Sequence, residues 1–590
     1  MVDHWQPRVL REYSFIADGE RGALIGPDGA IVWLCMPAWD SPAVFSGLLG
    51  GNGGYAITPA DPRYVWGGYY EAGSLIWRSR WTTKSVIECR ETMAMPADPH
   101  RCILLRRVVA RHGPARLQVA LDLRGGHGRQ PMLELSRDRG VWTGRTGNLR
   151  FRWSGGGRAR PDDSGRLVMT LNLAAGDAHD FVLEISDRVL TTPAPDPDQA
   201  WQSTEEAWSS AVPGCDDLIA VRDARQAYAI LIGLTASSGG MVAAATTSLP
   251  ERMDGVRNYD YRYAWIRDQC FAGLAVAAHG PHPLLANSVR FITARLHADG
   301  PGLLPAYTAA GGAIPAERGL RLPGYPGSTT RTGNRVCQQF QLDGLGEVLQ
   351  LLAAAARLDM LGAEDWQAVE IAAAAIEQRW LEPDAGIWEL DNQRWAHSRL
   401  ACVTGLRAIA AAADRPAASH GSRQAADWTA LADKILADLA DCVHPSGRWQ
   451  RAPDDERLDA ALLLPGIHGV PGHDDPRTAA TYQAVISELA EDGFVYRFRQ
   501  DSRPLHEAEG AFLLCGFWMA QAASARGDEL TAAHWFERSR SACGPAGLYA
   551  EEYDVHQRQL RGNLPQAFVH AGMLATAARL AAHGTGSLGG

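Results

Sequence analysis

The segment from Asn258 to Asp268 reads NYDYRYAWIRD and stands just before an apolar run with helical spacing. Its eleven positions hold four aromatic rings, two arginines and two aspartates. Aromatic rings offer flat faces to a sugar, and an adjacent arginine and aspartate supply donors and acceptors for neighbouring hydroxyl groups. We therefore predict a carbohydrate-binding loop that enters a helix. The alternative is an aromatic cluster in the core with an ion pair at the surface.

Most of the chain beyond residue 200 is rich in alanine, and its apolar side chains recur with helical spacing. The clearest predicted helices are 218–237, 342–361, 366–380, 404–413, 428–439 and 566–582. With weaker candidates, about a dozen helices are expected, joined by loops rich in Gly, Pro and Asp. A region made only of helices must pack their apolar faces against one another. A double ring achieves this and leaves a central pit lined by loops.

The first third of the chain alternates apolar and polar residues, as β-strands do. Such runs are 74–81, 86–92, 103–109, 117–123 and 167–173, separated by turn-forming residues. Many short strands with regular turns predict a sandwich. A linker with three prolines follows at 191–198, where helix interior and central strand are both excluded. The expected multidomain β + α chain has an antiparallel β-sandwich over 1–200, a linker helix region over 201–240 and a helical catalytic domain over 241–590.

Composition narrows the class of protein. The 590 residues exceed what one compact core holds, and 46% are apolar and 21% charged, as in globular proteins. A net charge of −10 without a long basic run argues against nucleic acid or an anionic membrane as partner. Nineteen tryptophans fit carbohydrate binding, since an indole packs on one side and meets a polar ligand on the other, but additional tryptophans in the core would give the same count. A homo-oligomer is compatible with the sequence, and the oligomeric state stays open.

Location and cofactors are predicted mainly from absences in the sequence. No apolar run is long enough to cross a bilayer, and residues 1–8 contain no apolar signal core, so a cytoplasmic location is expected. The ten cysteines are scattered, without a Cys-x-x-Cys pair or a Cys/His cluster at zinc spacing. They are expected to be reduced and mostly buried thiols. No metal and no cofactor is expected.

Several short sequence blocks follow one another along the chain. They are TSLPE (247–251) with residues 257–268, GIWE (386–389), EGAFLLC (509–515), and GLYAEEYD (547–554) with GNLPQAF (562–568), preceded by EYSFIADG (12–19) and IVWLC (31–35). Together they resemble glycoside hydrolase family 15, the inverting glucoamylases, glucodextranases and bacterial trehalases, and the two N-terminal blocks resemble the bacterial members. The resemblance covers nearly the whole chain. It implies an (α/α)6 barrel of six inner and six outer helices.

Two glutamates are the candidate catalytic residues. An inverting glycosidase needs one carboxyl group that protonates the leaving oxygen and another that deprotonates a water, about 6.5–9.5 Å apart. The resemblance implies Glu389 as general acid and Glu551 as general base. Trp388 beside Glu389 offers the apolar neighbourhood that keeps an acid protonated. The alternative for Glu389 is a surface glutamate held by Arg394.

The adjacent glutamates Glu551 and Glu552 compete for one role. Neighbouring side chains in an extended loop point in opposite directions, so only one of them is expected to face the pit. The resemblance assigns the base to Glu551. The alternative is that both are solvated loop charges.

Substrate contacts follow from the same resemblance. Arg267 and Asp268 match the pair that holds the hydroxyls of the terminal glucose, and Tyr261 and Trp265 match aromatic positions of the same subsite. Trp388 is a further wall residue. Core packing is the alternative role for these rings. His397, His506 and Glu509 are candidate supporting groups, for which a structural role is the alternative, and the loop 324–328 is expected at the edge of the pit.

The sequence leaves the substrate open. Leu390 follows Glu389 where fungal glucoamylases have a second glutamate that holds the leaving sugar. Bacterial trehalases also lack that glutamate, but AHSRL (396–400) differs from the trehalase-like pattern. We predict an exo-acting, inverting α-glucoside hydrolase that releases β-D-glucose from the non-reducing end of isomaltose- or maltose-type oligosaccharides. The alternatives are a trehalase and a non-catalytic sugar-binding protein, which would not need both glutamates.

Overall fold

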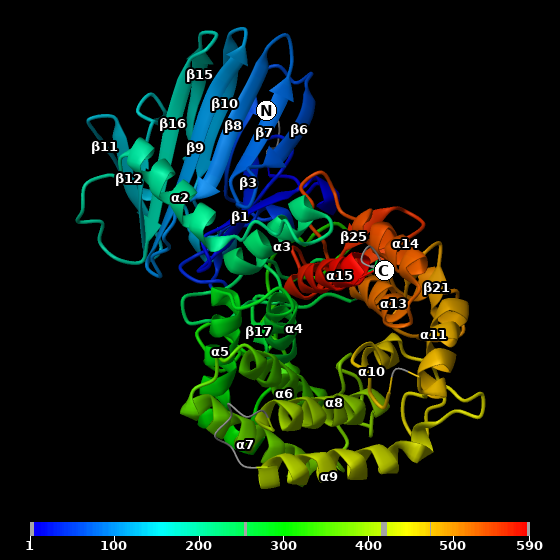
Figure 1. Ribbon diagram of the computed structural model, residues 1–590. Helices are drawn as coiled ribbons and strands as arrows, with labels where there is room; N and C mark the ends of the chain where they lie inside the picture. Colours follow the sequence, from blue (N-terminus) through cyan, green and yellow to red (C-terminus); the bar gives the residue numbers. More distant parts are fainter. Residues whose placement is uncertain (1–4, 253–256, 415–421, 473, 587–590) are drawn as a thin grey trace.

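The computed structural model describes residues 5–252, 257–414, 422–472 and 474–586. Two stacked sheets form the N-terminal part, and a ring of helices forms the rest (Figure 1). The C-terminal helix lies within the ring, beside the segment that connects the ring to the sheets.

Within the described residues, the N-terminal part consists of two eight-stranded antiparallel sheets. The first has the order β1-β2-β3-β5-β10-β15-β14 with β4 on β3, and the second β11-β12-β13-β16-β9-β8-β7-β6. The strands of the first sheet are β1 (Ser14–Ala17), β2 (Gly22–Ile25), β3 (Ala30–Cys35), β4 (Ala43–Phe45), β5 (Gly54–Pro59), β10 (Ala115–Asp122), β14 (Arg160–Pro161) and β15 (Leu167–Leu173). Those of the second are β6 (Val65–Tyr70), β7 (Trp77–Thr82), β8 (Val86–Met93), β9 (Arg101–His112), β11 (Leu133–Asp138), β12 (Val141–Thr146), β13 (Leu149–Ser154) and β16 (Ala178–Ser186).

The two sheets are joined by packing and by a buried arginine. Tyr55 of β5 packs edge to face on Trp153 of β13, with ring centroids 5.9 Å apart. Arg106 of β9 donates to the backbone carbonyls of Tyr55 in β5 and of Gly29 in the turn before β3, at 2.8 and 2.6 Å, and pairs with Glu91 on β8. Because Arg106 is fully buried, these partners replace its lost water contacts. The predicted β-sandwich is confirmed.

Helix α2 (Pro197–Ala211) follows the last strand and covers the second sheet at β9 and β16. Its N-cap Asp196 accepts a hydrogen bond from the backbone N–H of Gln199 at 2.9 Å. Pro197 occupies the first turn, where the missing N–H costs nothing. The proline-rich linker is therefore shorter than the predicted 191–198.

The helices form a double ring in the described ranges. The inner helices are α4 (Ile266–Ala277), α6 (Leu342–Arg357), α8 (Ala396–Ala413), α10 (Leu464–Ile467), α13 (Leu513–Ala525) and α15 (Ala567–Gly586). The outer helices are α3 (Val221–Gly233), α5 (Pro283–Asp299), α7 (Ala363–Arg379), α9 (Ser422–Asp438), α11 (Pro476–Leu489) and α14 (Glu529–Arg540). Six inner and six outer helices confirm the predicted (α/α)6 barrel.

Helix α8 differs from the sequence prediction, and α10 is shorter than the other inner helices. Helix α8 begins at Ala396, earlier than the predicted 404–413. Its first three turns are buried on all sides, so their sequence shows no amphipathic period from which the start could be predicted. Helix α10 is a single turn, extended by a 3-10 turn at Ala460–Leu463.

The segment 258–268 also joins the barrel to the sandwich. Arg262 donates to both carboxylate oxygens of Asp260, at 2.8 and 2.7 Å, and to the backbone carbonyls of Trp39 and Ser41, at 3.3 and 3.0 Å. Both charged side chains are fully buried, so this ion pair belongs to the core and not to the surface. The arginine thus links the loop that follows β3 to the barrel.

Replacing Arg262 by methionine should destabilise the protein by about 3–5 kcal/mol, because it leaves the Asp260 carboxylate buried without its partner. Urea unfolding followed by circular dichroism measures this change. The matched control is Arg222→Met. Its side chain is 89% exposed beside Asp223, and such a surface pair contributes at most about 1 kcal/mol. Equal losses in the two variants would contradict the structural role of Arg262.

Candidate active site

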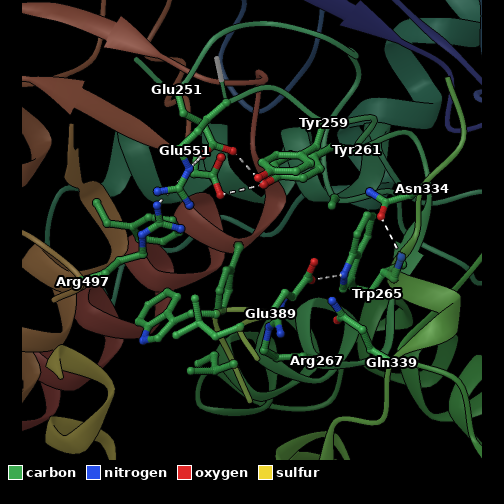
Figure 2. A pocket seen from close by; sticks show the side chains of 18 of the residues that line it. Glu251, Tyr259, Tyr261, Trp265, Arg267, Asn334, Gln339, Glu389, Arg497 and Glu551 are labelled. Carbon is green, nitrogen blue, oxygen red and sulfur yellow. Dashed lines mark hydrogen bonds and ion pairs between the residues drawn. The ribbon is translucent and has the colours of Figure 1, made fainter. Parts of the chain in front are cut away.

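A cavity of about 870 Å³ opens among the loops at one end of the barrel (Figure 2). Its lining runs along the chain from Ala243 to Phe568. All residues predicted to act in catalysis or to contact the substrate are among the lining residues: Tyr261, Trp265, Arg267, Asp268, Trp388, Glu389 and Glu551. The polar lining also includes Glu251, Arg257, Asn334, Gln339, Arg457 and Arg497. Segments far apart in the sequence therefore meet at one hollow.

Glu389 lies in the loop between α7 and α8 and has a left-handed backbone, with φ of 57°. Hydrogen bonds from Glu389 N to Gly386 O at 3.2 Å and from Leu390 N to Ala385 O at 2.8 Å hold this turn. The carboxylate accepts a hydrogen bond from Trp265 Nε1 at 2.7 Å and lies 3.7 Å from a guanidinium nitrogen of Arg267. A strained backbone at a non-glycine residue is typical of functional positions.

The surroundings of Glu389 differ from those predicted. Trp388 donates through Nε1 to Asp459 at 2.7 Å and packs its ring on Phe512, with centroids 5.3 Å apart. The nearest partners of the Glu389 carboxylate are thus an indole N–H and a cation, and its side chain is 29% exposed. Arg394, the alternative partner, forms an ion pair with Asp438 instead.

Glu551 and Glu552 point to different sides of the chain at the start of β24 (Glu552–Asp554). Glu551 lines the cavity and accepts a hydrogen bond from the Tyr261 hydroxyl at 3.0 Å. Glu552 is fully buried, pairs with Arg497 at 2.9 Å and accepts from the backbone N–H of Gly510 at 2.9 Å. Figure 2 shows Glu551 and Glu389 on different sides of the same cavity, with Tyr261 beside Glu551 and Trp265 beside Glu389.

Glu251 is a neighbour of Glu551 to which the sequence assigned no role. The hydroxyl of Tyr261 lies 3.2 Å from the Glu251 carboxylate as well. Its single proton is therefore shared between the carboxyl groups of Glu251 and Glu551 as a hydrogen-bond donor. Burial, and then the charge of Glu251, raises the pKa of Glu551 well above its usual range, while Arg497 acts in the opposite direction. A base with a raised pKa is a stronger proton acceptor once ionised.

The Glu251→Gln variant should shift the pH profile of kcat/KM. A general base works only as a carboxylate, so activity is lost as the pH falls through the pKa of Glu551. Removing the neighbouring charge lowers that pKa, and the acidic limb should therefore move to lower pH. Initial rates from pH 4 to 9 measure the shift. Glu317→Gln is the control, since Glu317 lines the same cavity but pairs with Arg331; an equal shift there would contradict the assigned coupling.

Arg267 and Asp268 lie in the first turn of α4, and both side chains are more than nine-tenths buried. Their charged atoms are 3.5 Å apart, and Arg267 also donates to Gln341 at 3.2 Å. Burial raises the pKa of Asp268 to about 6 although Arg267 opposes the shift. An incompletely paired carboxylate and a guanidinium at a cavity wall offer an acceptor and donors to vicinal hydroxyls.

The predicted supporting groups fall outside this cavity. His397 is buried behind it, where burial and then the Arg267 cation lower its pKa to about 3. Glu509 accepts hydrogen bonds from Arg257 at 3.2 Å and from Arg497 at 2.7 Å, so it belongs to the ion network beside Glu551. His506 lines a second, neighbouring cavity.

The loop 324–328 does not have its expected place at the edge of the pit. Gly324 donates to the carbonyl of Leu49 at 2.9 Å, and the Tyr325 hydroxyl donates to that of Arg8 at 2.8 Å. This loop packs on the N-terminal part, and the cavity edge is formed instead by residues near Asn334.

Comparison with known proteins shows the family of this chain. The family model "Glycosyl hydrolases family 15" matches residues 223–578, and the model "Trehalase-like, N-terminal" matches residues 5–141. The chain belongs to glycoside hydrolase family 15. The predicted family is thereby confirmed, together with glycosidase activity on a carbohydrate substrate.

Relatives of this family 15 hydrolase match along nearly its whole length. A trehalase of Mycobacterium tuberculosis is 30% identical, over 96% of this chain and 88% of that protein. A trehalase of Mycolicibacterium smegmatis is 30% identical, over 96% and 90%. A bacterial glucoamylase solved with acarbose has the same fold, with a TM-score of 0.71, 14% identity, and coverage of 98% of this chain and 95% of that one.

Two further sequence predictions concern the whole hydrolase. Among its described helices, none combines the length and apolar character needed to cross a bilayer. All ten cysteines fall in the described ranges and are free thiols, half-buried at Cys337 and Cys543 and buried elsewhere, as predicted.

Proposed function

We propose that this hydrolase cleaves α,α-trehalose with inversion at one anomeric carbon. The placement of Glu389 and Glu551 on different sides of one cavity carries the mechanistic part of the proposal. The choice of trehalose rests on relatives named trehalase that match along the whole chain, sandwich included. It departs from the preference for isomaltose- or maltose-type substrates that the sequence suggested.

In the proposed mechanism the two carboxyl groups divide the proton transfers. Glu389 donates a proton to the glycosidic oxygen as the bond to the anomeric carbon breaks. Glu551 takes a proton from a water that attacks this carbon from the opposite face. The hydroxyl of Tyr261, at 3.0 Å, keeps the base oriented toward the cavity. Arg267 and Asp268 hold the hydroxyls of the glucose that is cleaved.

Exo-hydrolysis of isomaltose- or maltose-type oligosaccharides is the second candidate. Leu390 lines the cavity next to Glu389, where a leaving sugar would lie, and an apolar side chain there demands no particular hydroxyl pattern. The cavity volume of about 870 Å³ also leaves space beyond a single glucose unit.

The product anomers test the proposal. Inverting cleavage of trehalose should give equal initial amounts of α- and β-glucose by proton NMR, because only one of the two anomeric carbons is attacked. In ¹⁸O-water the label should enter only the β-glucose. Initial α-glucose alone would mean retention and would contradict the roles of Glu389 and Glu551. Parallel assays with isomaltose, maltose and maltodextrins decide between the two substrates by kcat/KM.

A further inference from the structure

A second cavity of about 300 Å³ adjoins the first and shares Glu251 and Arg252 with its wall. His506 and His556 line it, and their rings stack with centroids 3.7 Å apart. Glu491 lies against both rings. These three residues come from separate elements: β21 (Ala490–Glu491), α12 (Leu505–Ala508) and the turn after β24.

The three side chains direct their ligand atoms at one another. The carboxylate oxygens of Glu491 lie 3.1 and 3.2 Å from Nδ1 of His506, and one lies 3.3 Å from Nε2 of His556. One ligand atom from each residue can be chosen so that all three lie within 4.8 Å of one another.

These distances match the edges of a metal coordination tetrahedron. With zinc bonds of about 2.0–2.1 Å to nitrogen and oxygen, neighbouring ligand atoms of a tetrahedron lie about 3.3–3.4 Å apart. The two nitrogen-to-oxygen separations are already near this length. The third edge, between the two nitrogens, is at most 4.8 Å long. The side chains of His506, His556 and Glu491 are 25%, 56% and 33% exposed, so they have room to shorten this edge.

We propose that Glu491, His506 and His556 bind a divalent transition-metal ion, Zn²⁺ in the first place. Two imidazoles and one carboxylate suit zinc and leave a fourth position to water. The sequence predicted no metal because the ligands are 15 and 50 residues apart, far from any zinc-binding spacing. Only the fold brings them together.

The location of the proposed site indicates a structural role for a bound ion. Glu491 precedes Arg497 in the chain, His506 precedes Glu509, and His556 follows Glu552. Arg497, Glu509 and Glu552 form the buried ion network beside Glu551. A metal at this site ties together the three segments that carry this network, and so acts as a structural clamp outside the reaction centre.

Zinc titration of the full-length, chelator-treated protein tests the site. Calorimetry should show one tight site per chain, and Zn²⁺ should raise the melting temperature, since a ligand bound only by the folded state stabilises it. Co²⁺ should give the intense visible absorption of tetrahedral coordination. His506→Ala and His556→Ala should each weaken Zn²⁺ binding at least about 10-fold, because even the loss of a group that only orients a ligand has an effect of that size.

His100→Ala is the matched control, since His100 is also exposed and ion-paired, but with the single carboxylate of Asp187. It should bind Zn²⁺ as the wild type does. Absence of a tight site in the wild type, or binding unchanged in both the His506 and His556 variants, would overturn the proposal and leave an ordinary His–Glu–His ion cluster. These readouts do not depend on activity, so the outcome is independent of the proposed substrate.

Discussion

Glu551→Gln is expected to lower kcat by about 10²–10⁴-fold, the usual contribution of a general base. The amide keeps the shape of the side chain and can still pair with the Tyr261 hydroxyl, so folding should persist. It cannot accept the proton of the attacking water. Steady-state rates, with circular dichroism to confirm folding, measure the effect.

Glu389→Gln should lower kcat for the natural substrate by a similar factor, but for a different reason. A general acid matters only when the leaving group needs a proton. An aryl α-glucoside with an acidic phenol leaves without one, so Glu389→Gln should retain most of its rate on that substrate, whereas Glu551→Gln should not. If the two variants respond alike to the aryl substrate, the division of roles is wrong.

The Glu552→Gln variant distinguishes a loss of stability from a loss of catalytic activity. Glu552 is buried against Arg497 and does not line the cavity, so its replacement should reduce stability first. A variant that unfolds at lower urea concentration but keeps its pH profile fits this position. If Glu551→Gln remains near wild-type while folded Glu552→Gln loses activity, the base has been assigned one residue too early.

The fold could be predicted because its signals are local. Alternation along 86–92 and 167–173 gives strands at nearly those residues, and apolar spacing predicts helices close to α3, α6, α7, α9 and α15. The signal fails for α8, where an inner helix is buried on every side, and for Pro197, which can start a helix as well as end a linker. Both failures depend on neighbours that a sequence window does not contain.

The cavity could be predicted less completely. The quoted blocks supplied every lining residue that the sequence named, because each block holds its residues within a few positions. The role of Glu251 beside Glu551 and the pairing of Arg497 with Glu552 were missed, since these partners are 300 and 55 residues apart in the chain. The partners of Glu389 were also mistaken, because Trp388 turns to Asp459 while Trp265, from a distant segment, supplies the hydrogen bond.

The proposed contacts of Arg267 and Asp268 predict that the enzyme binds the end of its substrate. Both lie at the head of α4 in the wall of the cavity, together with Tyr261 and Trp265. A wall that holds the terminal glucose would exclude a longer chain on that side. On a ladder of maltooligosaccharides or isomaltooligosaccharides, any product should therefore be single glucose units. Early fragments of middle length would mean that the cleft is open at both ends.

Asp268→Asn should lower kcat/KM by a similar factor for every accepted substrate. Asp268 is buried 3.5 Å from Arg267, and truncating one partner of a buried charge pair at an interface costs about 2–5 kcal/mol, or roughly 30-fold to several thousand-fold in affinity for the bound group. The glucose that it contacts is common to all substrates, so the loss should not depend on the leaving sugar. Leu390→Ala is the contrasting variant, because Leu390 lies beside Glu389 toward the leaving group and should change trehalose, maltose and isomaltose unequally. Substrate-dependent losses in Asp268→Asn would place this carboxylate on the leaving-group side of the cleaved bond, and the assignment of Arg267 and Asp268 to the terminal glucose would then be wrong.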